Sequence, residues 1–205
     1  MTADNVRPTP LQPTAESIPA ELAALRQWVT WAYELRGDKW QKIPKNPATG
    51  DNAASDNPDT WATLGEAMDA YRKREHAGIG FVFTASDPYA GIDLDDVLDP
   101  ATNHMQPWAT EAIDRLASYT ERSPSGTGVH IIVKASPPHT GKRGQVEVYD
   151  RGRYFCFTGA ILYRLDSIEE RQEQVATFCA VHWPASPPST APATPRRQYS
   201  DTEQV

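Results

Sequence analysis

Strand-like segments alternate with helix-like segments through most of this chain, and this order most strongly limits the fold that it can adopt. Apolar residues in strand patterns occupy residues 28–35, 78–84, 90–97, 128–135 and 145–162. Helical patterns occupy residues 20–28, 63–75, 107–118 and 167–183. We therefore predict an α+β (mixed α/β) fold with an open sheet and several helices.

Two of the expected helices begin with a capping-box sequence. Thr63 is followed by Glu66, and Ser167 is followed by Glu170. In a capping box the hydroxyl and the carboxylate satisfy N–H groups that the first helical turn leaves unpaired. Residues 42–60 are rich in Pro, Gly, Asn and Asp, which predicts a loop.

Both ends of the chain differ in composition from the middle. Residues 1–19 are rich in Pro, Thr and Ala, and residues 184–205 begin with a Pro/Ser/Ala/Thr-rich stretch. Such segments bury too little apolar surface to form a core. We predict a disordered tail at 1–19, one folded domain at 20–183, and a linker at 184–205 that leads into a truncated helical region.

Composition and charge exclude some classes of protein. No segment is long and apolar enough to span a membrane, and the N-terminus lacks signal-peptide features. Cys156 and Cys179 give no disulfide framework and no metal-binding spacing, so we expect buried thiols in a cytoplasmic protein. A net charge of −7 and a pI near 5.2 count against nonspecific nucleic-acid binding, but not against an enzyme that acts on nucleic acid.

The stretch GIDLDDVLDP, residues 91–100, contains four aspartates. Alternate side chains of a strand face opposite sides, so Asp93 and Asp95 share the face opposite Leu94. Two carboxylates on one strand face can bind a divalent cation such as Mg²⁺ or Mn²⁺. A solvated surface turn is the other interpretation of D-x-D taken alone. Asp96 and Asp99 are expected to shape the turn after the strand.

A loop of small residues precedes a second strand. Ser125, Gly126 and Gly128 lead into it, and His130 lies on the face opposite Val129. Glycines let backbone N–H groups approach an anion, so this loop and His130 could hold a phosphate. A hairpin turn followed by an ordinary strand histidine is equally compatible with the segment.

An acid also interrupts a third apolar strand. Glu147 lies between Val146 and Val148, which indicates either a wet strand face or a functional position. Asp150, three residues later, is expected to be a turn residue. If the strands that carry Asp93, His130 and Glu147 are neighbours, their polar side chains share one surface. That combination suits two-metal phosphoryl or nucleotidyl transfer.

The order of these motifs resembles the archaeo-eukaryotic primase superfamily, and most of all the primase–polymerase domains of phages, plasmids and integrated elements. The three motifs of that superfamily correspond to GIDLD, SGTGVH and VEV in this chain. The stretches RQWVTWAYELRGDKWQKIPKNPATG, NPDTW, GIGFVF and GRYFCFTG also match the phage-type branch. The resemblance extends from about residue 25 to residue 183.

The resemblance implies a fold, a site and an activity. The fold would be a sheet related to the RNA-recognition motif, packed against an N-terminal α/β unit. By this resemblance, two ions of Mg²⁺ or Mn²⁺ would be bound by Asp93, Asp95 and Glu147. The nucleotide would be contacted by Ser125, Gly126, Gly128, His130 and Arg153. Lys42 and Lys45 would contact template or nucleotide. The family acid in the third motif is often Asp, so Asp150 stays an alternative to Glu147.

The implied activity is that of a DNA primase and polymerase. It would copy a single-stranded DNA template from dNTPs or NTPs, during replication of a phage, plasmid or integrated element in a bacterial or archaeal cytoplasm. A superfamily 3-type helicase, in cis or in trans, would be a partner. Two alternatives remain open: another metal-dependent nuclease or nucleotide phosphohydrolase, and a non-catalytic nucleic-acid-binding remnant of the same fold.

Overall fold

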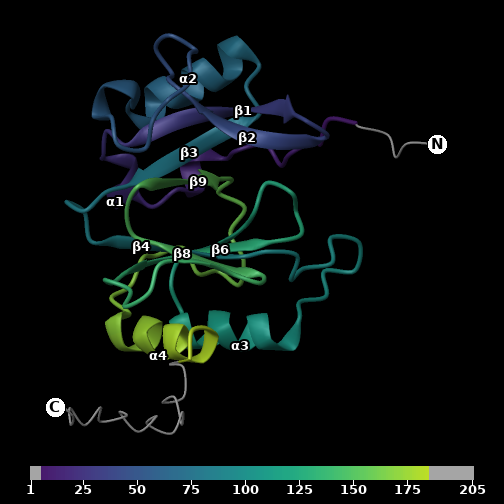
Figure 1. Ribbon diagram of the computed structural model, residues 1–205, viewed down its shortest axis with the longest axis vertical. Coiled ribbons are helices and arrows are strands. Elements are labelled where there is room, and N and C mark those ends of the chain that lie inside the picture. Colours follow the sequence, from purple (N-terminus) through teal and green to yellow (C-terminus); the bar gives the residue numbers. More distant parts are fainter. Residues whose placement is uncertain (1–5, 185–205) are drawn as a thin grey trace, which may run out of the picture.

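A computed structural model describes residues 6–184 as two antiparallel sheets packed with helices (Figure 1). The four-stranded sheet has the order β2-β1-β3-β9 and is formed by β1 Trp28–Arg36, β2 Lys39–Lys45, β3 Gly78–Phe83 and β9 Arg153–Phe157. The five-stranded sheet has the order β5-β6-β4-β8-β7 and is formed by β4 Tyr89–Leu94, β5 Thr120–Arg122, β6 Val129–Lys134, β7 Gly141–Arg143 and β8 Val146–Tyr149. The predicted α+β class is confirmed, but with two sheets in place of one open sheet.

The three longer α-helices lie on the outer side of the sheets. The α-helices are α1 Ala20–Ala23, α2 Leu64–Arg74, α3 Pro107–Leu116 and α4 Gln172–His182, and the 3₁₀ helices are η1 Ala15–Ser17 and η2 Pro58–Thr60. Figure 1 shows α2 beside the four-stranded sheet, and α3 with α4 beneath the five-stranded sheet. The short helix α1 lies between the two sheets instead, where Glu21 accepts a hydrogen bond from the Tyr89 hydroxyl of β4 and pairs with Lys134 of β6 (Figure 1). The two sheets meet in the middle of the molecule through one shared core cluster.

The expected loop at 42–60 begins too early, because its first residues belong to a strand. Strand β2 extends to Lys45 and includes Pro44, which pairs with Trp31 of β1. Proline cannot donate to a sheet ladder, so it is tolerated at an edge. β2 is such an edge strand, since it pairs with β1 alone among the strands of its sheet. The sequence pattern did not reveal this because Pro44 suggests a loop.

Two predicted helix starts differ in outcome. The capping box of α2 is confirmed, with Thr63 and Glu66 bonded reciprocally. The box predicted at Ser167 is wrong: α4 begins at Gln172, and the Ser167 hydroxyl bonds to the Glu169 carboxylate. The segment before α4 instead runs beside β6, where the Lys134 N–H donates to the Glu169 carbonyl. This pairing uses the backbone groups that a helix would need.

The segment before α1 is partly attached to the domain, although we expected residues 1–19 to form a disordered tail. The Leu11 N–H donates to the Pro124 carbonyl, and the Thr14 N–H donates to the Thr158 carbonyl. Ile18 is buried in the core. Residues 1–5 and 185–205, and with the latter all but the first residue of the predicted linker, lie outside the described residues.

Each face of the five-stranded sheet has a different environment. Its apolar face, which includes Ile92, Leu94 and Val148, is fully buried against α3 and α4. Its other face meets the four-stranded sheet through aromatic side chains such as Phe155. Cys156 and Cys179 are both buried, as predicted, and burial raises the pKa of the Cys156 thiol to about 11.

Gly91 allows the two sheets to pack closely. A Cβ atom at this position would lie 2.5 Å from the Phe155 ring and 2.9 Å from the Phe83 ring. We expect Gly91→Ala to lower the free energy of unfolding by about 1–3 kcal/mol, because overpacking displaces buried rings. The control Gly65→Ala, in α2 with open space at the Cβ position, should not lower it. Urea unfolding of both variants measures the difference, and equal stabilities would contradict the packing argument.

Candidate active site

Five polar side chains form a row across the five-stranded sheet. The strand register pairs Lys142 with Glu147, Glu147 with Asp93, Asp93 with His130, and His130 with Glu121. Directly paired residues on antiparallel strands project from the same face. The row therefore lies on the face that is turned toward the four-stranded sheet. The sequence argument required the strands that carry Asp93, His130 and Glu147 to be neighbours. They are neighbours, since β4 lies between β6 and β8.

Asp93 occupies the centre of the row in an unfavourable environment. Its Oδ1 atom is buried and has no hydrogen-bond partner among the described residues; His130 Nε2 is 3.7 Å away. Burial raises the pKa of Asp93, and the charges of Asp95 and Glu147 raise it further, while His130 opposes them. A buried carboxylate oxygen without a partner is costly, so this atom is suited to a cation.

Asp95 and Glu147 converge on one ammonium group. Lys142 Nζ donates to Asp95 Oδ2 at 2.7 Å and to Glu147 Oε1 at 2.6 Å. These two hydrogen bonds raise the pKa of Lys142. Within residues 6–184, no three His, Cys, Asp or Glu side chains are already arranged around one point as metal ligands.

The donor set nevertheless fits a divalent cation. Mg²⁺ and Mn²⁺ prefer carboxylate oxygens together with water and phosphate. Here, one buried oxygen of Asp93 has no hydrogen-bond partner in the described part of the chain, and the carboxylates of Asp95 and Glu147 already bind a positive charge. Asp93, Asp95 and Glu147, the three acids named from the sequence, therefore lie together. Asp95 and Glu147 are arranged around the Lys142 ammonium.

Glu121 is a site residue that the sequence reasoning missed. Its side chain is fully buried and accepts hydrogen bonds from the Tyr119 hydroxyl at 2.8 Å and from the Gly159 N–H at 2.7 Å. The Thr158 N–H lies 3.1 Å from both of its carboxylate oxygens. His130 Nδ1 is 3.2 Å from Glu121 Oε1. The only sequence signal was an acid beside two residues, Tyr119 and Thr120, that are typical of strands.

Glu121 fixes the orientation of His130. With Nδ1 held by Glu121, the other ring nitrogen, Nε2, points toward Asp93. Burial acts to lower the pKa of His130, but the carboxylates of Asp93 and Glu121 outweigh it and raise the pKa. The imidazole is therefore buried, oriented and biased toward its charged form.

The small-residue loop lies against the end of β4. Gly126 has a φ of +79°, which favours glycine, and a Cβ at Gly128 would lie 2.9 Å from the carbonyl of Leu94. The Ser125 hydroxyl bonds to the Thr127 hydroxyl, which donates to Asp96 Oδ1 at 2.9 Å. The loop is thus held beside the acidic segment. Asp96, with a φ of +52°, shapes the turn, as predicted.

Asp99 and Asp150 do not join the row. Asp99 closes its own turn by accepting the Ala101 N–H and the Thr102 hydroxyl. Asp150 is buried and is bound by the Arg151 guanidinium at 3.0 and 2.8 Å. Asp150 lies two residues after Val148, so it projects from the face opposite the row. Glu147 projects from the face that carries the row.

The two lysines named from the sequence have different surroundings. Lys42 Nζ lies 5.8 Å from the centre of the Trp31 ring. Burial acts to lower the pKa of Lys42, but Cys156 and Tyr33, and then Asp93 and Asp95, raise it. Lys45 is bound to Glu34 and to Asn52.

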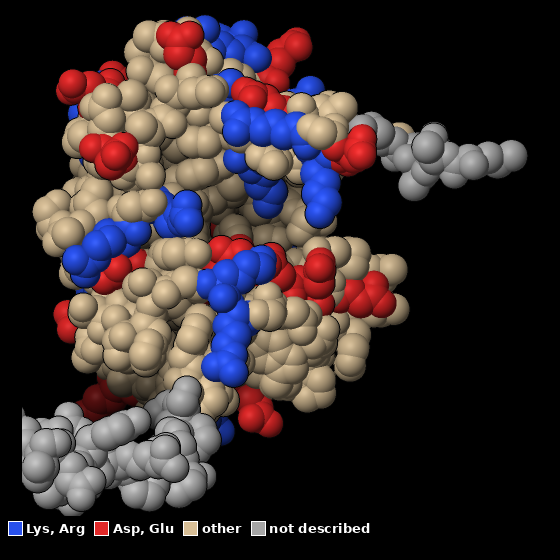
Figure 2. All heavy atoms as spheres, viewed as in Figure 1, with Lys and Arg blue, Asp and Glu red and all other residues tan. Residues whose placement is uncertain are grey.

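Arg153 belongs to the four-stranded sheet but reaches the five-stranded one. Its guanidinium lies 5.2 Å from the centre of the Tyr149 ring. Tyr149 projects from the same face as Glu147, two residues along β8. Figure 2 shows this region as a hollow between the sheets, with acidic atoms at its base and Lys and Arg side chains around it.

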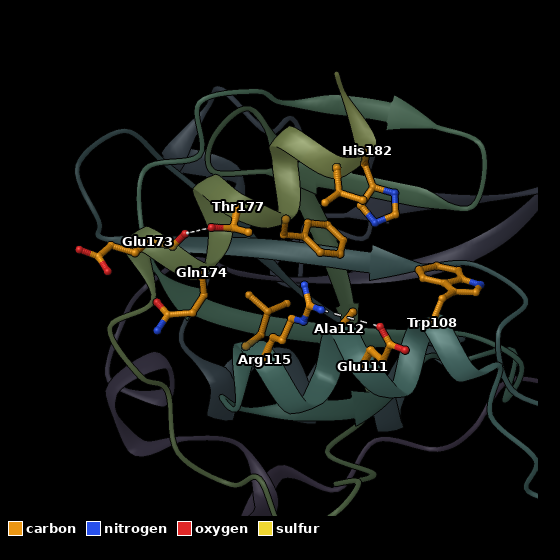
Figure 3. A pocket seen from close by; sticks show the side chains of 11 residues that line it. Trp108, Glu111, Ala112, Arg115, Glu173, Gln174, Thr177 and His182 are labelled. Atoms are coloured by element: carbon orange, nitrogen blue, oxygen red, sulfur yellow. Dashed lines mark hydrogen bonds and ion pairs between the residues drawn. The ribbon is translucent and has the colours of Figure 1, made fainter. Parts of the chain in front are cut away.

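A second hollow lies on the other side of the five-stranded sheet. Figure 3 shows this cavity of about 420 Å³ between α3 and α4, lined by residues such as Trp108, Phe178 and His182. Its charged side chains include Glu111 and Arg115, which pair with each other at 3.9 Å. No member of the row lines it, so we place the candidate site on the opposite face.

An α+β domain with a row of carboxylates and a histidine on the inner face of a sheet has the features of the primase superfamily that the motifs resemble. No family model matches the chain. The chain is 39% identical over 174 residues to the DNA primase-polymerase of Nitratiruptor phage NrS-1, covering 80% of this chain and 24% of that protein. Over most of its length, the chain is therefore similar to a phage-type primase–polymerase.

The chain spans about a quarter of the length of this relative. Within residues 6–184, none of the helices has the length and apolar character needed to cross a membrane.

Proposed function

We propose that this chain is a metal-dependent nucleotidyltransferase, the catalytic domain of a DNA primase–polymerase. The observation that carries the proposal is the centre of the row, where the buried Asp93 Oδ1 has no hydrogen-bond partner within residues 6–184 and lies beside the carboxylates of Asp95 and Glu147. The similarity to a phage protein named DNA primase-polymerase supports the same activity.

The acids would hold the metal. Asp93, Asp95 and Glu147 would bind Mg²⁺ or Mn²⁺, and we propose two ions. When bound, the ions would neutralise the triphosphate and activate the attacking hydroxyl. Asp95 and Glu147 would exchange their hydrogen bonds to the lysine for metal contacts.

The remaining residues would position the nucleotide. His130 Nε2, which is directed toward Asp93 Oδ1 at 3.7 Å, would donate to a phosphate oxygen. The loop at Ser125, Gly126 and Gly128 would offer backbone N–H groups to the same phosphates. Arg153, above Tyr149, would contact the nucleotide from the facing sheet.

The template and partners follow from the family. We propose single-stranded DNA as the template and dNTPs or NTPs as substrates, in replication of a phage, plasmid or integrated element in the cytoplasm of its host. A superfamily 3-type helicase would act in cis or in trans. Lys42, whose pKa Cys156, Tyr33, Asp93 and Asp95 raise, is the better placed of the two lysines for a template or nucleotide contact. Lys45 would first have to leave Glu34.

The test is extension of a primer annealed to single-stranded DNA, with dNTPs and Mn²⁺ or Mg²⁺, beside the Asp93→Ala/Asp95→Ala variant. We expect extension that stops on chelation and is absent in the variant. Omitting the primer and adding NTPs then tests priming. Degraded DNA or released phosphate without extension would indicate a nuclease or phosphohydrolase. Nucleotide binding that is independent of metal, without turnover, would indicate a non-catalytic module.

A further inference from the structure

Lys142 is placed where a bound metal would be expected to act. It lies on β7, opposite Glu147 of β8, and its ammonium bridges Glu147 and Asp95 at 2.6 and 2.7 Å. Asp95 directly follows the end of β4 and Glu147 lies on β8, so the ammonium joins carboxylates from two separate segments. Without a cation between them, two like charges at this separation would repel each other.

A metal ion and this ammonium compete for the same pair of carboxylates. Each carboxylate oxygen keeps further lone pairs beside its hydrogen bond to Lys142, so the competition is one of charge. A divalent ion close to these oxygens would repel the ammonium, since two cations would then lie side by side. Binding of metal to this pair therefore favours departure of the ammonium.

Lys142 is able to leave. Its side chain is 53% exposed, and its flexible four-carbon stem lets the ammonium move into solvent without disturbing the sheet. Buried lysines with fixed partners, by contrast, serve to hold a structure together. The position therefore combines two strong contacts with free access to water.

We propose that Lys142 is an internal cation that occupies the Asp95–Glu147 pair in the absence of metal and is displaced when a divalent ion binds. This proposal rests on the proposed function only in that Asp95 and Glu147 are metal ligands. If it holds, Lys142 competes with the metal and sets the metal concentration at which the site fills. Until metal binds, Lys142 also holds the two carboxylates together.

The test is a titration of the purified chain with Mn²⁺, following free Mn²⁺ by electron paramagnetic resonance, without nucleotide or DNA. Lys142→Met keeps the length of the side chain and removes its charge. We expect it to bind Mn²⁺ about tenfold more tightly than the wild type, equivalent to about 1.4 kcal/mol. Thermal unfolding gives a second readout: without metal the variant should melt below the wild type, and saturating Mn²⁺ should remove the difference.

The matched control is Arg143→Met. Arg143 is adjacent and equally cationic, but it pairs with Val146 and so projects from the other face. Its loss should change Mn²⁺ affinity by less than about twofold, because solvent screens its charge. If both variants tighten binding equally, the effect is one of net charge and the proposal fails. Unchanged or weaker binding by folded Lys142→Met would overturn it as well.

Asp93→Asn separates this failure from failure of the proposed function. If Asp93→Asn binds Mn²⁺ as the wild type does, the metal site itself is wrongly placed. If Asp93→Asn loses binding while Lys142→Met matches the wild type, the metal site stands and the competition is refuted.

Discussion

Replacing Asp93 with asparagine should lower the rate of nucleotide incorporation at least about a thousandfold and leave the metal-free protein no less stable. The loss of rate follows from removing a metal ligand, since metal stabilisation contributes several kcal/mol and each 1.36 kcal/mol is a factor of ten. Stability should hold because the raised pKa of Asp93 means that its surroundings disfavour the charged form. A neutral amide removes that penalty.

Primer extension and thermal melting in the presence of a chelator measure the two effects separately. The matched control is Asp96→Asn, the same change three residues away. Among the described residues, the Asp96 carboxylate accepts one hydrogen bond, from the Thr127 hydroxyl, and an asparagine oxygen can also accept it, so activity should persist. An active Asp93→Asn protein would show that the centre of the row is not a metal ligand.

Replacing Glu121 with glutamine should reduce the free energy of unfolding by about 3–5 kcal/mol, although the two side chains have nearly the same shape. Both Glu121 oxygens face donors: the N–H groups of Thr158 and Gly159, the Tyr119 hydroxyl and His130 Nδ1. An amide NH₂ cannot accept those hydrogen bonds and leaves buried donors unpaired. It also removes the charge that stabilises protonated His130. Incorporation should fall too at temperatures where the variant is folded, because His130 loses its anchor.

Urea unfolding measures the loss of stability in Glu121→Gln, and two further variants serve as comparisons. Tyr119→Phe removes one donor and leaves the carboxylate its other partners, so it should cost about 1 kcal/mol. Glu66→Gln, at an exposed helix cap, tests the same chemistry in water and should cost less than Glu121→Gln. A Glu121→Gln protein as stable as Glu66→Gln would mean that Glu121 does not anchor this part of the fold.

Much of the fold was predictable where a local pattern decides it. Strands β1, β3 and β4 and helices α2 and α3 lie close to their predicted segments, because the apolar periodicity is strong there. The prediction failed for β2, where Pro44 is tolerated only at a sheet edge, and for α4, where pairing with β6 replaced the first helical turn. Both errors arise from partners that are distant in sequence.

The sequence by itself determined which way the site residues point. Asp93, His130 and Glu147 each alternate with buried aliphatic neighbours, and the twofold period of a strand then sets their face. Tertiary structure alone decided that their strands are neighbours and in register, which brings them into one row. It also added Glu121 and Lys142, since a hydrogen-bond partner across a sheet is fixed by strand order and register, and neither is written in the local sequence.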